Sequence, residues 1–195
     1  MKNAARLTRD FFEQPTLQVA INLLGQHLVR IRPGHARVAG VIVETEAYIG
    51  SEDLACHARS GKTARNMSMW GDPGRSYVYF VYGMHWMLNI VTASAGLPAA
   101  VLIRSIFPLE GIEQMARRRN NQPLEELANG PAKLCQAFDI DGALDGHDLC
   151  NPESKIFIEA AETPAPESVT SGPRVGLNSV PEPWKSKPWR FCLNP

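Results

Sequence analysis

The chain has 195 residues, of which 44% are hydrophobic and 21% are charged. This composition is ordinary for a globular protein and excludes an intrinsically disordered chain. At roughly 100–200 residues per domain, the length predicts a single domain over residues 1–195. No apolar run approaches the about 18 residues that a membrane helix needs. Residues 1–10 lack the apolar segment of a signal peptide, so we expect a cytoplasmic protein with no membrane partner.

The formal net charge is zero, with 20 basic and 20 acidic residues. This balance gives no support to a nucleic-acid-binding function, because domains of that class are usually basic. The distribution is uneven, since residues 57–104 contain a single acid, Asp72, and five basic residues: Arg59, Lys62, Arg65, Arg75 and Arg104. Such a stretch could form a phosphate-binding face. Charge alone favours the simpler interpretation, a chance fluctuation on a solvated surface.

The cysteines are far apart and form no CxxC pair: Cys56, Cys135, Cys150 and Cys192. In a chain without a signal peptide, this pattern predicts reduced thiols. None of the five histidines has the spacing to a cysteine or to another histidine that is typical of zinc sites. We therefore expect neither a metal nor another cofactor.

The predicted elements begin with a helix within residues 10–28, for which Gly25 is a stop signal. Residues 27–32 and 37–48 have the pattern of two strands around a turn at Pro33-Gly34. Further along, the sequence predicts strands at 77–81, 86–91 and 99–105, and helices at 109–119 and at 133–138, the last with Pro131 in its first turn. Prolines interrupt residues 163–173 and 181–188, where we expect loops with short strands.

Strands dominate this prediction, and no alternation of strands with helices is present. The expected fold class is therefore α+β, a single domain around a curved, mostly antiparallel β-sheet.

The predicted strand over residues 41–48 carries an unusual set of side chains. Strict alternation places Glu44, Glu46 and Tyr48 on one face, and on the other Val41, Val43, Thr45 and Ala47. Two carboxylates and a phenol are costly to bury without a purpose, so they could form a general base beside an aromatic platform. The alternative is a sheet with one solvated face, where acids are harmless. The segment by itself does not decide between the two.

Residues 77–86 are rich in aromatic side chains and are centred on a turn that contains Gly83. Such a run is most often a core hairpin with aromatic cross-strand pairs. A tight turn, however, leaves little room to bury both Tyr82 and Met84. A large side chain at a hairpin tip can act as a wedge between stacked bases. The basic residues just upstream make a wedge on a phosphate-binding face a reasonable hypothesis.

An ordered series of short motifs resembles the alkyladenine (3-methyladenine, alkylpurine) DNA glycosylase family. The series comprises Glu44-Thr45-Glu46-Ala47-Tyr48, His57, Arg65-Asn66, Tyr77-Val78-Tyr79, Tyr82-Gly83-Met84-His85, Asn89, Val101-Leu102-Ile103-Arg104, Asn129 to Gln136, and Pro173-Arg174-Val175-Gly176. Each motif alone is weak, but together they run in order through roughly residues 10 to 191. Ala132, where the family commonly has glycine, and the bulky Trp86-Met87-Leu88 are the departures from its pattern.

The resemblance implies a base-excision-repair enzyme that flips damaged purines out of duplex DNA and hydrolyses their N-glycosidic bond. The expected lesions belong to the class of 3-methyladenine, 7-methylguanine, hypoxanthine and ethenoadenine. Glu46 matches the residue that activates the hydrolytic water. Arg104 and the main-chain carbonyl of Val175 match the groups that position this water. No lysine matches a Schiff-base nucleophile, so the enzyme is expected to be monofunctional, without lyase activity.

The resemblance also assigns a base pocket. Tyr48 and Tyr79 match its aromatic walls, and His57 completes it and hydrogen-bonds the base. Asn89 matches the side chain that excludes purines with an unmodified guanine-type amino group. The acid that protonates neutral lesions stays open between His57 and a water.

The resemblance also implies that the predicted hairpin protrudes and inserts into DNA. Tyr82 matches the wedge that fills the gap left by the flipped nucleotide, and Met84 lies beside it. The partner is double-stranded DNA containing damaged purines, and the protein is expected to act as a monomer in a bacterial nucleoid. Candidate phosphate contacts, which the sequence does not rank, are Arg59, Lys62, Arg65 and Arg75.

Two other function classes stay open at this point. A lesion-binding module without catalysis would use the same wedge and tyrosines, but it has no need for Glu46 together with Arg104. A small-molecule nucleoside hydrolase would have no use for an exposed Tyr82. Glu44 is interpreted as structural and paired with an arginine.

Overall fold

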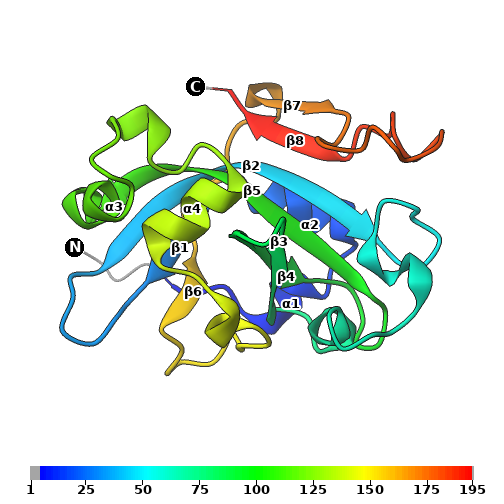
Figure 1. Cartoon of the computed structure of the whole chain (residues 1–195), viewed down its shortest axis with the longest axis horizontal. Helices are drawn as coiled ribbons and strands as arrows, with labels where there is room; N and C mark the ends of the chain where they lie inside the picture. The colour runs from blue at the N-terminus through cyan, green and yellow to red at the C-terminus, as the bar shows by residue number, and fades with distance from the viewer. Residues whose placement is uncertain (1–4, 195) are drawn as a thin grey trace.

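The computed structural model describes residues 5–194, and its strands form one sheet. Six strands follow each other in the order β3-β4-β5-β2-β1-β6, while β8 pairs with β2 and β7 with β8, all antiparallel (Figure 1). Their bounds are β1 His27–Arg30, β2 Val38–Ile49, β3 Ser76–Val81, β4 His85–Val91, β5 Ala99–Glu110, β6 Ile156–Glu159, β7 Val169–Gly172 and β8 Arg190–Leu193. The predicted α+β class with a curved antiparallel sheet is confirmed.

The helices are short and pack on the sheet: α1 Arg9–Phe12, α2 Thr16–Asn22, α3 Ile112–Arg118 and α4 Pro131–Phe138. Helix α2 packs on β2 and β5, and α4 packs on β4 and β5. Single turns of 3-10 helix occur in the connections: His57–Ser60, Met67–Trp70, Leu124–Glu126, Gly142–Leu144 and Pro166–Ser168. No helix within residues 5–194 is both long and apolar enough to cross a membrane.

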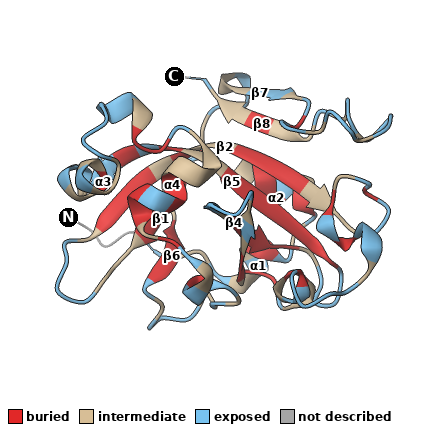
Figure 2. Cartoon of the chain, in the orientation of Figure 1, coloured by how far each residue is buried: buried red, intermediate tan, exposed pale blue. Residues whose placement is uncertain are grey.

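The core lies under the long central strands. Figure 2 shows that the middle parts of β2 and β5 are buried, whereas the segment that follows β7 is largely exposed. Side chains such as Ile42, Ile103 and Phe138 are fully buried and belong to one apolar cluster. Burial of such side chains stabilises the fold by about 1.5–3 kcal/mol each. The two long strands are thus anchored in the core.

The predicted helix within 10–28 is in fact two helices, α1 and α2, separated at Pro15. Proline has no amide hydrogen and disfavours helical backbone in the residue before it, so the chain breaks there. The predicted helix at 109–119 is also too long, since β5 continues to Glu110. Pairing of Glu110 with Ala39 of β2 extends the strand, and α3 starts after Gly111.

The predicted alternation along 41–48 is wrong at its start. A β-bulge between Ile42 and Glu44 shifts the register against β5. As a result Ile42 is fully buried in the core, while Val41 and Val43 are only half-buried. Beyond the bulge the predicted alternation holds. It places Glu44, Glu46 and Tyr48 on the face of β2 that forms the candidate site.

Candidate active site

A cavity of about 330 Å³ opens beside strands β2, β3, β4 and β5. Its lining includes seven of the side chains or backbones expected at the site: Tyr48, His57, Tyr79, Tyr82, Asn89, Arg104 and Val175. Most of these come from sheet strands, while His57 starts a 3-10 turn and Val175 lies in the segment between β7 and β8. The structure therefore brings together residues that are up to 127 positions apart in the chain (48 to 175).

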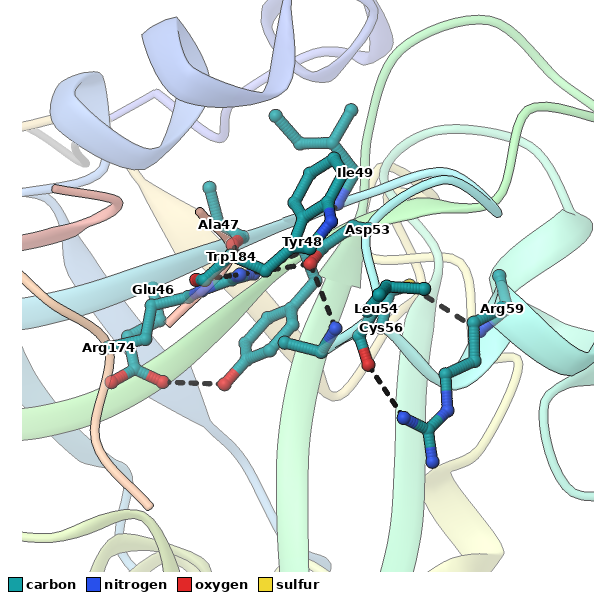
Figure 3. A network of polar contacts seen from close by, with 12 residues as sticks. Glu46, Ala47, Tyr48, Ile49, Asp53, Leu54, Cys56, Arg59, Arg174 and Trp184 are labelled. Atoms are coloured by element: carbon teal, nitrogen blue, oxygen red, sulfur yellow. Dashed lines mark hydrogen bonds and ion pairs between the residues drawn. The ribbon is translucent and has the colours of Figure 1, made fainter. Parts of the chain in front are cut away.

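Glu46 lies behind this cavity and is fully buried. Its Oε1 accepts a hydrogen bond from the backbone N–H of Val175 at 2.7 Å, and Arg104 Nε lies 3.4 Å from the same oxygen. Its Oε2 accepts a hydrogen bond from the Tyr48 hydroxyl at 2.8 Å (Figure 3). All three partners line the cavity. The solvated-face interpretation of this strand is therefore wrong, because the central carboxylate is shielded from water.

Burial raises the pKa of Glu46 above its usual value, because the carboxylate has lost its hydration. The charge of Arg104 and the hydrogen bonds from Val175 and Tyr48 oppose this shift. Burial also raises the pKa of Tyr48, and the neighbouring charge of Glu46 adds to the effect, so the phenol stays a hydrogen-bond donor. A carboxyl group with a raised pKa beside a cavity is typical of acid–base catalysis.

Glu44 forms the outer part of this acidic face. Its Oε1 accepts hydrogen bonds from Arg104 Nε at 3.1 Å and from Arg190 Nη1 at 3.2 Å. The expected pairing of Glu44 with an arginine is confirmed. Arg104 thus lies between two carboxylates, and Glu44 fixes the orientation of its guanidinium toward Glu46.

The aromatic side of the cavity is tightly connected. The rings of His57 and Tyr79 meet edge to face, with centroids 4.6 Å apart. The Nδ1 atom of His57 lies 2.8 Å from the Tyr77 hydroxyl. Burial, followed by the charges of Arg65 and Arg59, lowers the pKa of His57, so its imidazole is neutral at pH 7. Asn89, which is buried, donates from Nδ2 to the backbone carbonyl of Tyr77 at 3.0 Å.

The connection between β3 and β4 is highly exposed. The side chain of Tyr82 is 82% exposed and that of Met84 is 67% exposed. Tyr82 has a φ of +55°, and Gly83 follows with a φ of +66°. Such backbone is unusual for a tyrosine and directs a large apolar side chain into solvent. Tyr82 borders the cavity, whereas Met84 borders a separate hollow next to α4.

The candidate phosphate contacts differ in how they are held. Arg59 donates to the carbonyl of Leu54, and Arg65 donates to the carbonyl of Phe80 while lying 5.5 Å from the centre of the Tyr79 ring. Lys62 lies 6.0 Å from the Trp70 ring. Arg75 is bound to Asp72 and to the carbonyl of Gly146. Arg65 is therefore placed beside a cavity wall, while Arg75 already has protein partners.

Three important residues received no role from the sequence. Tyr77 holds both His57 and Asn89 through its hydroxyl and carbonyl groups. Asp53 and Arg174 form an ion pair whose two side chains are completely buried. These two are 121 positions apart, so no local pattern connects them. The one available signal was the position of Arg174 directly before Val175 in a motif of the family.

Comparison with known sequences settles the family. The family model of methylpurine-DNA glycosylases (MPG) matches residues 10–195. The chain belongs to the methylpurine-DNA glycosylase family. Its members are DNA glycosylases, enzymes that hydrolyse N-glycosyl bonds in the repair of DNA. The resemblance seen in the ordered motifs is thereby confirmed.

Individual relatives cover nearly the full chain. A protein of Methanocella arvoryzae is 49% identical over 186 residues, which are 95% of this chain and 90% of the relative. A protein of Desulfitobacterium hafniense is 46% identical over 197 residues, covering 96% of this chain and 95% of the relative. Both bear the name "Putative 3-methyladenine DNA glycosylase". As a DNA glycosylase of this family, the protein has DNA as its substrate.

Proposed function

We propose that the cavity accepts a damaged purine flipped out of duplex DNA, and that Glu46 activates the water that cleaves its N-glycosidic bond. The substrate class comprises 3-methyladenine, 7-methylguanine, hypoxanthine and ethenoadenine. The burial of Glu46 behind a cavity lined by Tyr48, Arg104 and Val175 carries this proposal. A module that only binds lesions gains nothing from a buried carboxylate, whose desolvation is costly.

Flipping is needed because a purine inside a duplex hides its glycosidic bond, and extrusion costs a few kcal/mol. The exposed Tyr82 beside the cavity is placed to fill the gap in the base stack. Stacking of the flipped base on Tyr48 and Tyr79 returns about 1–3 kcal/mol per contact. Alkylated purines that carry positive charge gain a further cation–π attraction of up to about 2 kcal/mol. The pocket therefore favours electron-poor bases over normal ones.

Asn89 and His57 supply the polar selectivity. Because Nδ2 of Asn89 is bonded to the Tyr77 carbonyl, its amide is held in one orientation against the incoming base. A guanine-type 2-amino group meets this fixed side chain unfavourably, so neutral guanine is rejected, whereas the positive charge of 7-methylguanine offsets the contact by attraction to the aromatic walls. His57 is neutral, so it acts on the base as a hydrogen-bond partner and not as a store of protons. We assign the protonation of neutral leaving bases to a water.

The bond cleavage has an oxocarbenium-like transition state, as in glycoside hydrolysis. Glu46 accepts a proton from the attacking water and stabilises the developing positive charge on the sugar. Arg104 and the hydrogen bond from Val175 keep the buried carboxylate ionised and oriented. The carbonyl of Val175 adds a contact to the water. Charged alkylated bases leave without protonation.

The reaction ends with base release. The described lining of the cavity contains no lysine, so within residues 5–194 no amine is placed there to form a Schiff base. The protein is therefore proposed to be monofunctional. The test uses duplexes with one 7-methylguanine, hypoxanthine or ethenoadenine, and measures free base, abasic sites and strand breaks separately. Base release with intact, alkali-labile strands supports the proposal, whereas spontaneous strand cleavage or no release contradicts it.

A further inference from the structure

A buried ion pair lies behind one wall of the cavity. Arg174 Nη1 and Nη2 contact Asp53 Oδ2 and Oδ1 at 2.5 and 2.9 Å, and neither side chain has any exposed surface. Asp53 also accepts from the backbone N–H of Ala55 at 3.0 Å. Arg174 donates as well to the carbonyl of Ala47 at 2.9 Å. Figure 3 shows this network around Asp53 and Tyr48. The pair is therefore fixed in place by the backbone on both sides.

The guanidinium of Arg174 stacks on the pocket tyrosine. It lies 4.7 Å from the ring centre of Tyr48 and 5.0 Å from that of Trp189. Tyr48 lines the cavity, whereas Arg174 is excluded from solvent. The cation therefore covers a side of the Tyr48 ring that the cavity does not reach. A base stacked on the open side would lie about 8 Å from the guanidinium, with the ring between them.

This arrangement is unfavourable for a positively charged base unless the arginine is neutralised. Two unit charges about 8 Å apart, at an effective dielectric constant of about 20, repel each other enough to weaken binding on the order of 30-fold. A neutral base does not meet this repulsion. The bidentate carboxylate of Asp53 sits directly on the guanidinium and cancels most of its field.

We propose that Asp53 is a specificity-determining residue, which neutralises Arg174 behind Tyr48 so that the pocket can accept a cationic alkylated purine. This inference rests on the proposed function. It adds a structural reason why the pocket accepts positively charged bases. A merely structural role for the pair predicts a different result. Loss of packing or of the position of Val175 would affect cationic and neutral bases alike.

The test compares binding of two lesions by the same variant. Half-saturating enzyme concentrations are measured in single-turnover reactions with duplexes containing 7-methylguanine, which is cationic, or hypoxanthine, which is neutral. Ground-state binding is used because the charge of the alkylated base is present before cleavage. For Asp53→Asn, Arg174 stays charged, and we expect the half-saturating concentration to rise roughly tenfold more for 7-methylguanine than for hypoxanthine.

Two further variants separate charge from structure. In Asp53→Asn/Arg174→Gln both charges are absent, so the ratio between the two lesions should return to the wild-type value even if both bind more weakly. In Arg174→Gln alone no guanidinium charge remains, and Asp53 is either neutralised by a proton or negative, so the ratio should stay at the wild-type value or shift in favour of 7-methylguanine. A shift against 7-methylguanine in this variant would overturn the inference, which keeps the test decisive if Asp53→Asn does not fold.

The matched control is Glu159→Gln. Glu159 receives an equally bidentate pair of hydrogen bonds from Arg37, but on β6, at the end of the sheet order opposite to β3. Its loss should leave the ratio unchanged. Equal effects of Asp53→Asn on both lesions, or the same ratio in the single and double variants, would overturn the inference while leaving the glycosylase function intact. Absence of base release by the wild type would instead reject the proposed function.

Discussion

The backbone N–H of Val175 donates a hydrogen bond to the buried carboxylate of Glu46 over 2.7 Å. This contact ties the segment between β7 and β8 to the C-terminal half of β2. Two donors, Val175 and Tyr48, thus occupy one oxygen each of the carboxylate, and Arg104 adds a nearby positive charge. These three groups stabilise the ionised form of the glutamate in a place where burial disfavours it.

Removal of the Tyr48 hydroxyl should shift the pH dependence of the reaction. The hydrogen bond from Tyr48 lowers the pKa of Glu46, so Tyr48→Phe raises this pKa further. Because the ionised form is the proposed base, the acidic limb of the single-turnover rate against pH should move to higher pH. The phenyl ring preserves stacking, so lesion binding should change less than threefold. An acidic limb that stays in place, or moves to lower pH, contradicts the assigned role of the hydroxyl.

Glu46 should reduce the stability of the folded protein at neutral pH. Its pKa is raised on folding, so between the unfolded and folded pKa values the native state binds more protons, and the stability falls as pH rises. Glu46→Gln removes this cost. Its thermal midpoint should exceed that of the wild type at pH 7, and the difference should narrow as the pH falls toward 4. Calorimetry over this pH range measures the difference in thermal midpoint between Glu46→Gln and the wild type. A difference that is smaller at pH 7 than at pH 4 would refute the account.

Tyr82→Ala should damage function without damaging the fold. The side chain is 82% exposed, so its loss should change the free energy of unfolding by about 0.5 kcal/mol or less. Loss of a stacking contact of about 1–3 kcal/mol should weaken productive binding of lesion duplex by roughly 5- to 150-fold. The half-saturating enzyme concentration on duplex DNA measures this effect. Unchanged activity would favour a hydrolase of small nucleosides over an enzyme acting on duplexes.

The basic residues near the pocket should differ in their contribution to salt dependence. Each phosphate contact adds about 0.9 to the slope of log affinity against log salt. Arg65 lies beside the wall residue Tyr79, where we expect it to contact one phosphate. Arg65→Ala should therefore lower the magnitude of this slope by about 0.9. Arg75→Ala is the matched comparison, since Arg75 is already bound to Asp72 and to Gly146. Fluorescence titrations of lesion duplex at several salt concentrations measure the slope for each variant. An unchanged slope for Arg65→Ala would show that Arg65 does not contact a phosphate.

Much of the fold followed from local patterns. The strands were found because alternating and β-branched residues lie between clear turn signals, as around β3 and β4. The errors came from non-local effects. Pairing with β2 extended β5 through Glu110, against the helical pattern of residues 109–119. The bulge after Ile42 reversed the exposure of Val41 and Val43, and bulges leave no reliable local signature.

The site was predictable to the extent that short motifs carry it. The motifs pointed to residues of β2, β3 and β4, and the structure places these residues around one cavity, while their roles stay predictions. The ion pair of Asp53 and Arg174 was not identified, because its members meet only when the segment after β7 folds back onto β2. Likewise, the support that Tyr77 gives to His57 and Asn89 depends on its hydroxyl and carbonyl directions, which a sequence does not specify.

The most direct test of the account is a comparison of Glu46→Gln with Glu44→Gln on a duplex containing hypoxanthine. Glu46 is the proposed base, so its amide should reduce single-turnover base release by about 100- to 10,000-fold while lesion binding stays within threefold of wild type. Glu44 only orients Arg104, so Glu44→Gln should lose about tenfold or less. Full activity of Glu46→Gln, or a larger loss in Glu44→Gln than in Glu46→Gln, would contradict the central claim that Glu46 activates the water.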